Sequence, residues 1–505
     1  FVRSANVLYR GGLISKRKYD SIRSSLTMTK NEGSSGKMHI QVMPNVGIPK
    51  LLTYKKLIKK IIEINIGELH DVREKLCNGL EEEDKADGKY RDLLQLLLRL
   101  AQFYLFANKF REDKLEWFGQ KEGNFKVFGG DGAPFDKDDQ SLAWLVSFAN
   151  CGKRISSPEE NYLLFGANCA EDCSVAKRYI NLLMQQMKVV EQNSYTVSVS
   201  GEEKTMSFEF ELLPNDMKYL AFIGGELPIS ASYFSPFADV KTADLNNLKG
   251  KFGTEASNKW KPWNYSDRLK VVAAVEKTKQ ELSKRTDLRQ STVRSKITSF
   301  ICSKKSRQEF VPLVGDFIDK TKVEPLHLKN NAWQHWHLFV LKYALSKTNV
   351  GNCETVHDVP ETSVFGNFYS CVRYTIKTTR LAKKIRKWWI DGRTKDKDLE
   401  YRLTGKESRL FCKNFMKLIM ALRSDGDDDR SIFKLHVFAF TAINLRNAVS
   451  LFNRHLLSND DLESLRISCT NFYRASLFLA AKPTSWTIGH VVPVHTKQLR
   501  FYCFW

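Results

Sequence analysis

The chain has 505 residues, with 79 Lys and Arg against 57 Asp and Glu and a formal net charge of +22. A basic excess of this size favours a polyanionic partner such as nucleic acid, and the length permits roughly two to four domains with ample cores. No run of about 18 apolar residues is free of charge, and the N-terminus shows no secretory hydrophobic region. Both observations disfavour a transmembrane or secreted protein, and no membrane partner is expected.

The N-terminal region is the most basic part of the chain. Residues 1 to 60 hold 13 Lys and Arg against 2 Asp and Glu, a net charge of +11 (13 − 2), which is half of the total. Residues 4 to 9 and residues 15 to 23 predict two helices joined by a glycine turn, the second basic and capped by Ser15. A helix-turn-helix that reads DNA and an ordinary helical hairpin with a solvated basic face both explain this pattern. The candidate DNA-binding residues are Lys16, Arg17 and Lys18.

Three strands and a helix are predicted between residues 125 and 191. Residues 125 to 130 are a β-rich run that ends in two glycines, and residues 142 to 148 and 162 to 165 are apolar runs of strand length. Residues 171 to 191 carry large apolar residues at fourfold spacing. That spacing predicts an amphipathic helix.

A half-buried hairpin is predicted next. Apolar and polar residues alternate over residues 195 to 199 and again over residues 206 to 212, with a turn at Gly201-Glu202 between them. The second arm ends at Leu213-Pro214-Asn215, and Asp216 follows at the predicted start of a helix.

Two aspartates, Asp131 and Asp216, each lie just past the end of a predicted strand. Metal-dependent nucleic-acid cutting enzymes of the ribonuclease-H type bring distant carboxylates together in this way. Mg²⁺ is usually held by one or two carboxylates, with substrate phosphate and water in its other positions. Two such ions about 4 Å apart can clamp the attacking and leaving oxygens of a phosphodiester. Asp131 and Asp216 are therefore the predicted catalytic and metal-binding residues.

Short motifs around these aspartates carry a family resemblance. They are Gly130-Asp131-Gly132, the helix after Asn168 to Asp172, the stretch from Phe208 to Lys218, and Gly225-Glu226-Leu227. Together they resemble the catalytic core of the Transib transposases, the group that includes the catalytic subunit of the vertebrate V(D)J recombinase. The likeness covers residues 125 to 239 and recurs weakly at residues 323 to 327, 401 to 409 and 487 to 495.

The resemblance implies a fold and a division of the chain. It implies an α/β ribonuclease-H-like core with a mixed sheet, interrupted by a large all-α insertion and preceded by an α-helical basic region. Long apolar-periodic segments between residues 331 and 479 fit the insertion. The expected parts are a DNA-binding region at 1–115, the first part of the core at 116–240, the insertion at 241–480 and a truncated return to the core at 481–505.

The resemblance also implies a reaction and its ligands. Asp131 and Asp216 match the first two carboxylates of the family, which hold two Mg²⁺ or Mn²⁺ ions. Water attacks a phosphodiester at the element end, and the freed 3′ hydroxyl then attacks a second phosphodiester. The third carboxylate is a glutamate expected shortly after residues 487 to 495, and residues 496 to 505 contain none. The metal site is therefore expected to be incomplete, in a fragment or a decayed copy.

The zinc site of the family is not expected here. The family carries a Cys-x-x-Cys pair and a late His-x4-His pair, which together suit a tetrahedral structural site. In this sequence Ser235 and Ala238 stand at the cysteine positions, while His490 and His495 keep the histidine spacing. Two histidines without their partner ligands do not make such a site, and ordinary loop histidines explain them.

A second basic segment ends in two tryptophans. Residues 380 to 389 predict a helix with bases that neutralise DNA phosphates, and a solvated basic helix with inward-packed tryptophans explains the pattern equally well. The candidate nucleic-acid-binding residues are Lys383, Lys384, Arg386 and Lys387.

Three functions stay open at this point. The first is a transposable-element-derived DNA transposase that acts in the nucleus on element ends and target DNA, with a homodimer implied by the resemblance alone. The second is a non-catalytic DNA-binding remnant, and the incomplete metal site leaves open whether the chain is an enzyme. The third is an unrelated helical interaction protein whose basic surface binds RNA or acidic partners.

Overall fold

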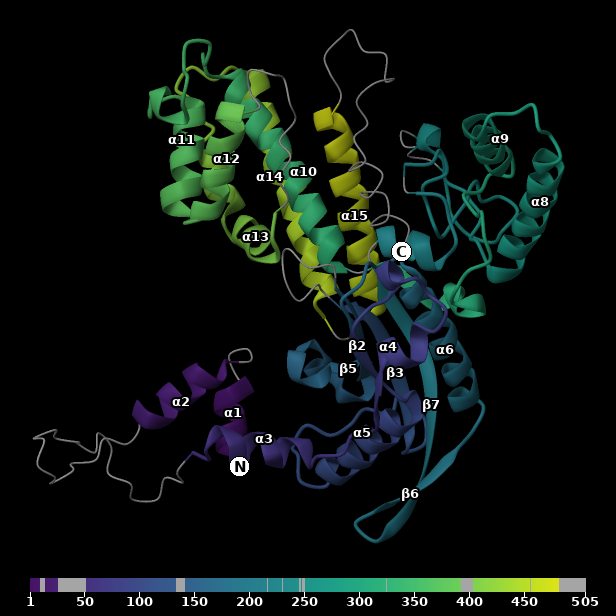
Figure 1. Ribbon diagram of the computed structural model, residues 1–505. Helices are drawn as coiled ribbons and strands as arrows, with labels where there is room; N and C mark the ends of the chain where they lie inside the picture. Colours follow the sequence, from purple (N-terminus) through teal and green to yellow (C-terminus); the bar gives the residue numbers. More distant parts are fainter. Residues whose placement is uncertain are drawn as a thin grey trace, which may run out of the picture. The chain divides into compact units, whose positions relative to one another are not determined.

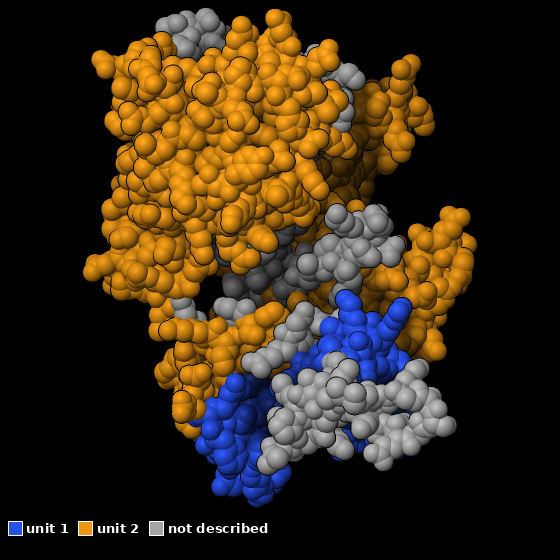
Figure 2. Space-filling model, turned by 90° about the vertical axis from the view of Figure 1, so that its left-hand side faces the viewer, with its two compact units in different colours: residues 1–70, 91–111, 196–204 blue, residues 71–90, 112–195, 205–505 orange. Residues whose placement is uncertain are grey.

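The structure, a computed structural model, falls into two compact units. One comprises residues 1–70, 91–111 and 196–204, and the other comprises residues 71–90, 112–195 and 205–505 (Figure 2). The residues that the structure describes are 1–9, 14–25, 51–132, 141–215, 217–228, 230–244, 247, 250–323, 325–391, 403–454 and 456–480.

The first unit contains the basic N-terminal helices. The predicted pair of helices is confirmed, and the second begins after Ser15, whose Oγ accepts a hydrogen bond from the Lys18 backbone N–H at 3.3 Å. Leu8, Tyr19 and Leu57 are fully buried and form a small core between these helices and the next one. The helices of this unit are α1 (Val2–Tyr9), α2 (Lys16–Ser25), α3 (Tyr54–Ile62) and α5 (Leu93–Asn108).

Eight strands of the described chain form one mixed sheet in the order β1-β2-β5-β4-β3-β7-β6, with β8 paired to β7. β4 is antiparallel to both β3 and β5, whereas β7 is parallel to β3 and to β8. The strands are β1 (Leu69–Asp71), β2 (Gly88–Arg91), β3 (Asn124–Gly132), β4 (Leu142–Phe148), β5 (Tyr162–Ala167), β6 (Tyr195–Val199), β7 (Glu202–Asn215) and β8 (Thr321–Val323).

The strands predicted between residues 125 and 212 are all present, with longer ends for most of them. The strands β1, β2 and β8 were not predicted, because each has only three or four residues and no alternating pattern of its own. The expected mixed sheet with a large helical part is confirmed. Strands β1 and β2 lie within residues 1–115, which were expected to be helical.

One face of the sheet carries an aromatic core. The Phe125 ring of β3 lies 4.8 Å from Phe148 of β4 and 6.0 Å from Phe208 of β7, measured between ring centroids. Trp144 lies on the same face of β4 as Phe148, because side chains alternate along a strand. The Trp144 ring lies 6.3 Å from Tyr179 of α6 (Ser174–Glu191). The helix α6 therefore covers this face (Figure 1).

In its described residues, the region from 265 to 480 is mostly helical, as expected, but the strand β8 lies within it and does not fit an all-α insertion. The described residues from 240 to 264 instead form a short 3₁₀ helix (Thr242–Asp244), turns and isolated bridges, such as the pairing of Phe252 with Trp260. The remaining helices are α4 (Val72–Leu76), α7 (Met217–Ile223), α8 (Tyr265–Ser283), α9 (Gln290–Ser303), α10 (Pro325–Ser346), α11 (Val364–Ser370), α12 (Thr379–Asp391), α13 (Gly405–Met420), α14 (Asp429–Phe452) and α15 (Asn459–Ala480).

The helices α10 to α15 share one large core (Figure 1). Trp333 and Trp336 of α10 are fully buried, and the Trp336 indole N–H donates to the Phe438 carbonyl oxygen of α14 at 3.0 Å. By length and composition α14 could cross a membrane, but 44% of its most apolar window is buried inside the protein. It is accounted for as a core helix of this bundle.

Candidate metal-binding edge

The ends of β3 and β7 meet at one edge of the sheet. The two strands are adjacent and parallel, and Phe128 pairs with Leu212. These residues lie three positions before Asp131 (131 − 128) and Asn215 (215 − 212), the last residue of β7. Both strands therefore end on the same side of the sheet. In α/β sheets, ligands bind outside the carboxyl ends of parallel strands.

Asp131 lies within β3, not just past its end as the sequence predicted. Its Cα pairs with that of Trp144, because the antiparallel ladder with β4 continues through Gly130 and Gly132. Asp216 lies outside the described residues, directly between Asn215 at the end of β7 and Met217 at the start of α7. The structure therefore brings together β3, which contains Asp131, and β7, which ends one residue before Asp216.

Trp144 also anchors the helix that follows Asp216. Its indole N–H donates to the Tyr219 hydroxyl of α7 at 3.0 Å, and both side chains are almost completely buried. This buried hydrogen bond ties the first turn of α7 to β4, the strand that pairs with β3 at Asp131. Sequence patterns did not identify Tyr219, since its partner lies 75 residues earlier.

The same edge includes the beginning of α6. β5 runs in the direction of β3, because both are antiparallel to β4, and so its last residue, Ala167, lies at this edge. Lys218, two residues after Asp216, forms an ion pair of 3.5 Å with Glu171 from the connection between β5 and α6. This exposed pair joins the two segments that border the edge, and it contributes little stability by itself.

Two cysteines lie at the start of α6. The Cys173 Sγ accepts a hydrogen bond from the Ala176 backbone N–H at 3.4 Å and thereby caps the helix, which starts three residues later than the predicted residue 171. A hydrogen bond from Cys169 lowers the pKa of the Cys173 thiol to about 6, and the backbone N–H groups of the helix start act in the same direction. The pKa of Cys169 is raised by the same contact and by burial.

The pH dependence of alkylation should show the lowered pKa of the Cys173 thiol. Because the thiolate is the reactive form, the rate at which iodoacetamide modifies Cys173 should rise through about pH 6 and level off by neutral pH. Cys412 of α13 is a suitable comparison, since burial raises its pKa and its rate should still increase above pH 9. Peptide mass spectrometry measures both rates in one sample, and a Cys173 rate that keeps rising beyond pH 8 would contradict the assignment.

The loop where the resemblance places zinc ligands is held by other means. The Ser235 Oγ accepts hydrogen bonds from the backbone N–H groups of Phe237 and Ala238 at 3.2 and 3.1 Å, which closes a local turn. In the described part of the chain, no group of three or more His, Cys, Asp or Glu side chains is placed to hold a metal ion. His490 and His495 lie outside the described residues.

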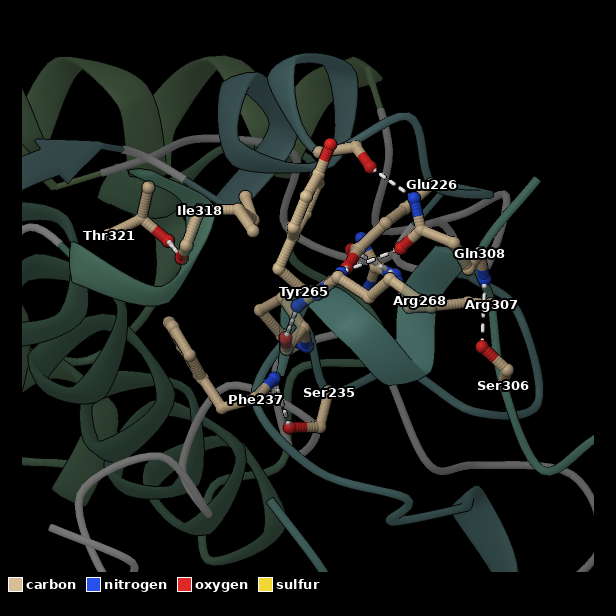
Figure 3. Close-up of polar contacts among 12 residues, drawn as sticks. Glu226, Ser235, Phe237, Tyr265, Arg268, Ser306, Arg307, Gln308, Ile318 and Thr321 are labelled. Atoms are coloured by element: carbon tan, nitrogen blue, oxygen red, sulfur yellow. Dashed lines mark hydrogen bonds and ion pairs between the residues drawn. The ribbon is translucent and has the colours of Figure 1, made fainter. Parts of the chain in front are cut away.

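Two buried arginines fix this loop from inside (Figure 3). Arg307 donates to the Phe234 carbonyl oxygen at 2.6 Å, and Arg268 donates to the Pro236 carbonyl oxygen. Glu226 forms ion pairs with both guanidinium groups, at 2.7 Å in the case of Arg307. The side chains of Glu226, Arg307 and Arg268 are 1%, 2% and 5% exposed, so the loop depends on a charge cluster that water does not reach.

Gln308 completes this cluster, which we call the arginine clamp (Glu226, Arg268, Arg307 and Gln308). Its side-chain oxygen accepts from Arg268 at 2.7 Å, and its amide nitrogen donates to the Gly224 carbonyl oxygen just after α7. The clamp thereby joins the end of α7 to α8 and to the loop from Ser235 to Ala238. Glu226 belongs to the Gly225-Glu226-Leu227 motif of the sequence analysis. No local sequence pattern predicted a role for Arg268 or Arg307.

The predicted basic residues are exposed on their helices, with one exception. Lys16, Arg17 and Lys18 lie on the solvent side of α2, and Lys383, Arg386 and Lys387 lie on that of α12. Lys384 is partly buried and forms an ion pair with Glu407 at 3.5 Å. Trp389 packs inward and is buried, while Trp388 is half-buried, so the tryptophans belong to the core of the helical bundle.

No protein-family model matches this sequence, and no curated protein matches it either.

Proposed function

We propose that the chain is a DNA transposase-like or recombinase-like protein with a ribonuclease-H-like core, in which Asp131 and Asp216 bind divalent metal ions. The observation that carries the proposal is the parallel pairing of β3 with β7. It puts the strand of Asp131 beside the strand that ends immediately before Asp216. Two carboxylates at adjacent strand ends suit Mg²⁺ or Mn²⁺, with DNA phosphate and water completing the coordination.

The rest of the sheet supports the proposal. Three antiparallel strands, β5, β4 and β3, are continued by the parallel strands β7 and β8, and α6 lies between the two groups in the sequence. Most helices of the described chain follow residue 264, within the range 241–480 where the resemblance places the insertion. An unrelated helical interaction protein would have no reason to pair β3 with β7 in this register.

A metal titration tests the proposal on the chain as it stands. We expect the chain to bind Mn²⁺ in the presence of duplex DNA, as measured by the loss of the free-ion electron paramagnetic resonance signal. Asp131→Asn and Asp216→Asn should each weaken the binding at least about tenfold, because each removes a charged oxygen ligand. Asp287→Asn, in the exposed connection between α8 and α9, is the matched control and should change nothing.

Equal Mn²⁺ binding by all four proteins would contradict the metal site. A chain that binds DNA with a steep salt dependence but binds no additional Mn²⁺ would instead be the non-catalytic nucleic-acid-binding protein.

A further inference from the structure

A single turn of π-helix lies just before α12. Residues Cys371–Thr375 form this turn, between α11 and α12. The Arg373 guanidinium stacks over the Tyr374 ring at 4.9 Å from its centroid, and Tyr374 is 60% exposed. Lys377 follows with a left-handed backbone angle (φ 59°). Such turns are rare and often occur at functional sites. Here Tyr374 and, two residues after the turn, Lys377 are exposed, while Arg373 is partly buried.

The helix α12 continues the positive charge. Leu381, Ile385 and Trp389 are buried, so the opposite side of the helix faces solvent. That side carries Arg380, Lys383, Arg386 and Lys387, all exposed. Seven residues at 1.5 Å per residue spread these charges over about 10 Å.

The helix α13 carries a second row of cations that sequence patterns did not single out. They lie three or four residues apart, on the side opposite the buried residues Phe411, Phe415 and Leu418. Eleven residues separate the first from the last, which corresponds to about 16 Å along the helix. The row consists of Lys406, Arg409, Lys413 and Lys417.

The three segments lie close to one another. The Lys384 Nζ of α12 lies 3.5 Å from the Glu407 carboxylate of α13, which places the two helices side by side. Both helices also contact the π-helical turn.

Negative charge is nearly absent from this surface. Among the described side chains of the turn, α12 and α13, the only carboxylate is Glu407. It is 4% exposed, accepts a hydrogen bond from the Thr404 backbone N–H at 2.7 Å and pairs with Lys384. Asp391, the last residue of α12, is the other carboxylate of these segments. The exposed cations of α12 and α13, together with Arg373 and Lys377, therefore have few acidic neighbours within these segments, and we call them the α12–α13 basic surface.

We infer that the α12–α13 basic surface binds the phosphate backbone of duplex DNA without reading its sequence. The charges are spread over two helices, which fits an extended polyanion better than a small anion. Tyr374 is the exposed aromatic ring of the surface and is already stacked on Arg373, so it offers little for the base stacking that single strands require. Contacts from Arg, Lys and Tyr to phosphate position a protein on a duplex.

The inference extends the proposed function but does not depend on the metal site. Duplex binding by these helices would hold DNA while the aspartate edge acts, and it would persist in a protein without metal. The surface should therefore bind duplex DNA in a buffer with EDTA, where no divalent metal is available to the aspartate edge, which separates failure of the metal site from failure of the surface.

The test removes three charges from α13 in the full chain. The variant is Arg409→Gln, Lys413→Gln and Lys417→Gln, at exposed helix positions where Gln is a good helix former. We expect the affinity for a mixed-sequence duplex at low salt to fall at least about tenfold, and the slope of log affinity against log salt to become shallower by about 2.7, which is three contacts of 0.9 each.

The matched control removes the same charge from another helical pair. It is Lys277→Gln, Lys284→Gln and Lys296→Gln, exposed positions on or next to α8 and α9. This control should keep the slope of the original chain. An equal loss of slope in both triple variants would show that net charge alone draws in DNA. Tighter binding of single-stranded RNA than of duplex DNA, lost in the α13 variant, would overturn the choice of partner, and circular dichroism confirms that each variant is folded.

Discussion

Replacing Asp131 by Asn is expected to abolish Mg²⁺-dependent nicking of duplex DNA in any form of the protein that supplies the third carboxylate. Asn keeps the shape of the side chain but loses the charge that holds a hard cation. Asp216→Asn should have the same effect, since a two-metal site uses both ions for the attacking and leaving oxygens. Relaxation of a supercoiled plasmid measures nicking with Mg²⁺ and with Mn²⁺.

DNA binding is the control for this loss. Both variants should bind duplex DNA with the affinity and salt dependence of the unchanged protein, because the predicted phosphate contacts come from basic helices. Nicking that survives either substitution at more than about one hundredth of the original rate would remove that aspartate from the metal site.

Replacing Glu226 by Ala is expected to destabilise the protein strongly. The substitution leaves the guanidinium groups of Arg268 and Arg307 buried without their counter-charge. Burial already lowers the pKa of Arg307, and the Glu226 charge opposes that effect. Removal of one partner from a buried ionic cluster costs on the order of 3–5 kcal/mol. Hydrogen exchange on peptides from residues 223 to 310 should therefore increase first, and the loop around Ser235 should lose its protection.

A surface glutamate on the neighbouring helix is the matched control. Glu276 of α8 pairs with Lys279 at 2.9 Å, and its side chain is 48% exposed. Glu276→Ala should cost less than about 1 kcal/mol, since Glu276 is solvated and Lys279 keeps its second partner, Glu309, at 3.7 Å. If the two variants unfolded at the same denaturant concentration, the arginine clamp would not be what holds this loop.

Local patterns predicted those elements whose stability is local. The alternation over residues 195 to 212 gave the hairpin, and fourfold spacing gave α6. The start of α6 was missed by three residues because Cys173 acts as the cap, a role usually taken by Ser, Thr, Asp or Asn. β8 was missed because its three residues are stabilised by pairing with Leu213–Asn215, about a hundred residues earlier in the chain.

For the candidate site, too, the sequence predicted the local features and missed the long-range contacts. Neighbouring glycines and predicted strand ends identified Asp131 and Asp216 as candidates. The parallel pairing of β3 with β7 is a contact between residues far apart in the sequence, so no local pattern could predict it. Trp144 and Tyr219, and likewise Arg268 and Arg307, acquire their roles only when distant segments pack together. The α13 cations could have been found by their helical spacing, which is as regular as that of α12.

The most direct measurement of the shared metal site is iron-directed cleavage of the protein itself. Fe²⁺ can replace Mg²⁺, and with ascorbate and peroxide it produces hydroxyl radicals that cut the nearby backbone. We predict cuts near residue 131 and near residue 216 in the same sample, both suppressed by excess Mg²⁺ and both lost in Asp131→Asn. Cuts near residue 216 that persist at full strength in Asp131→Asn would contradict a common metal site.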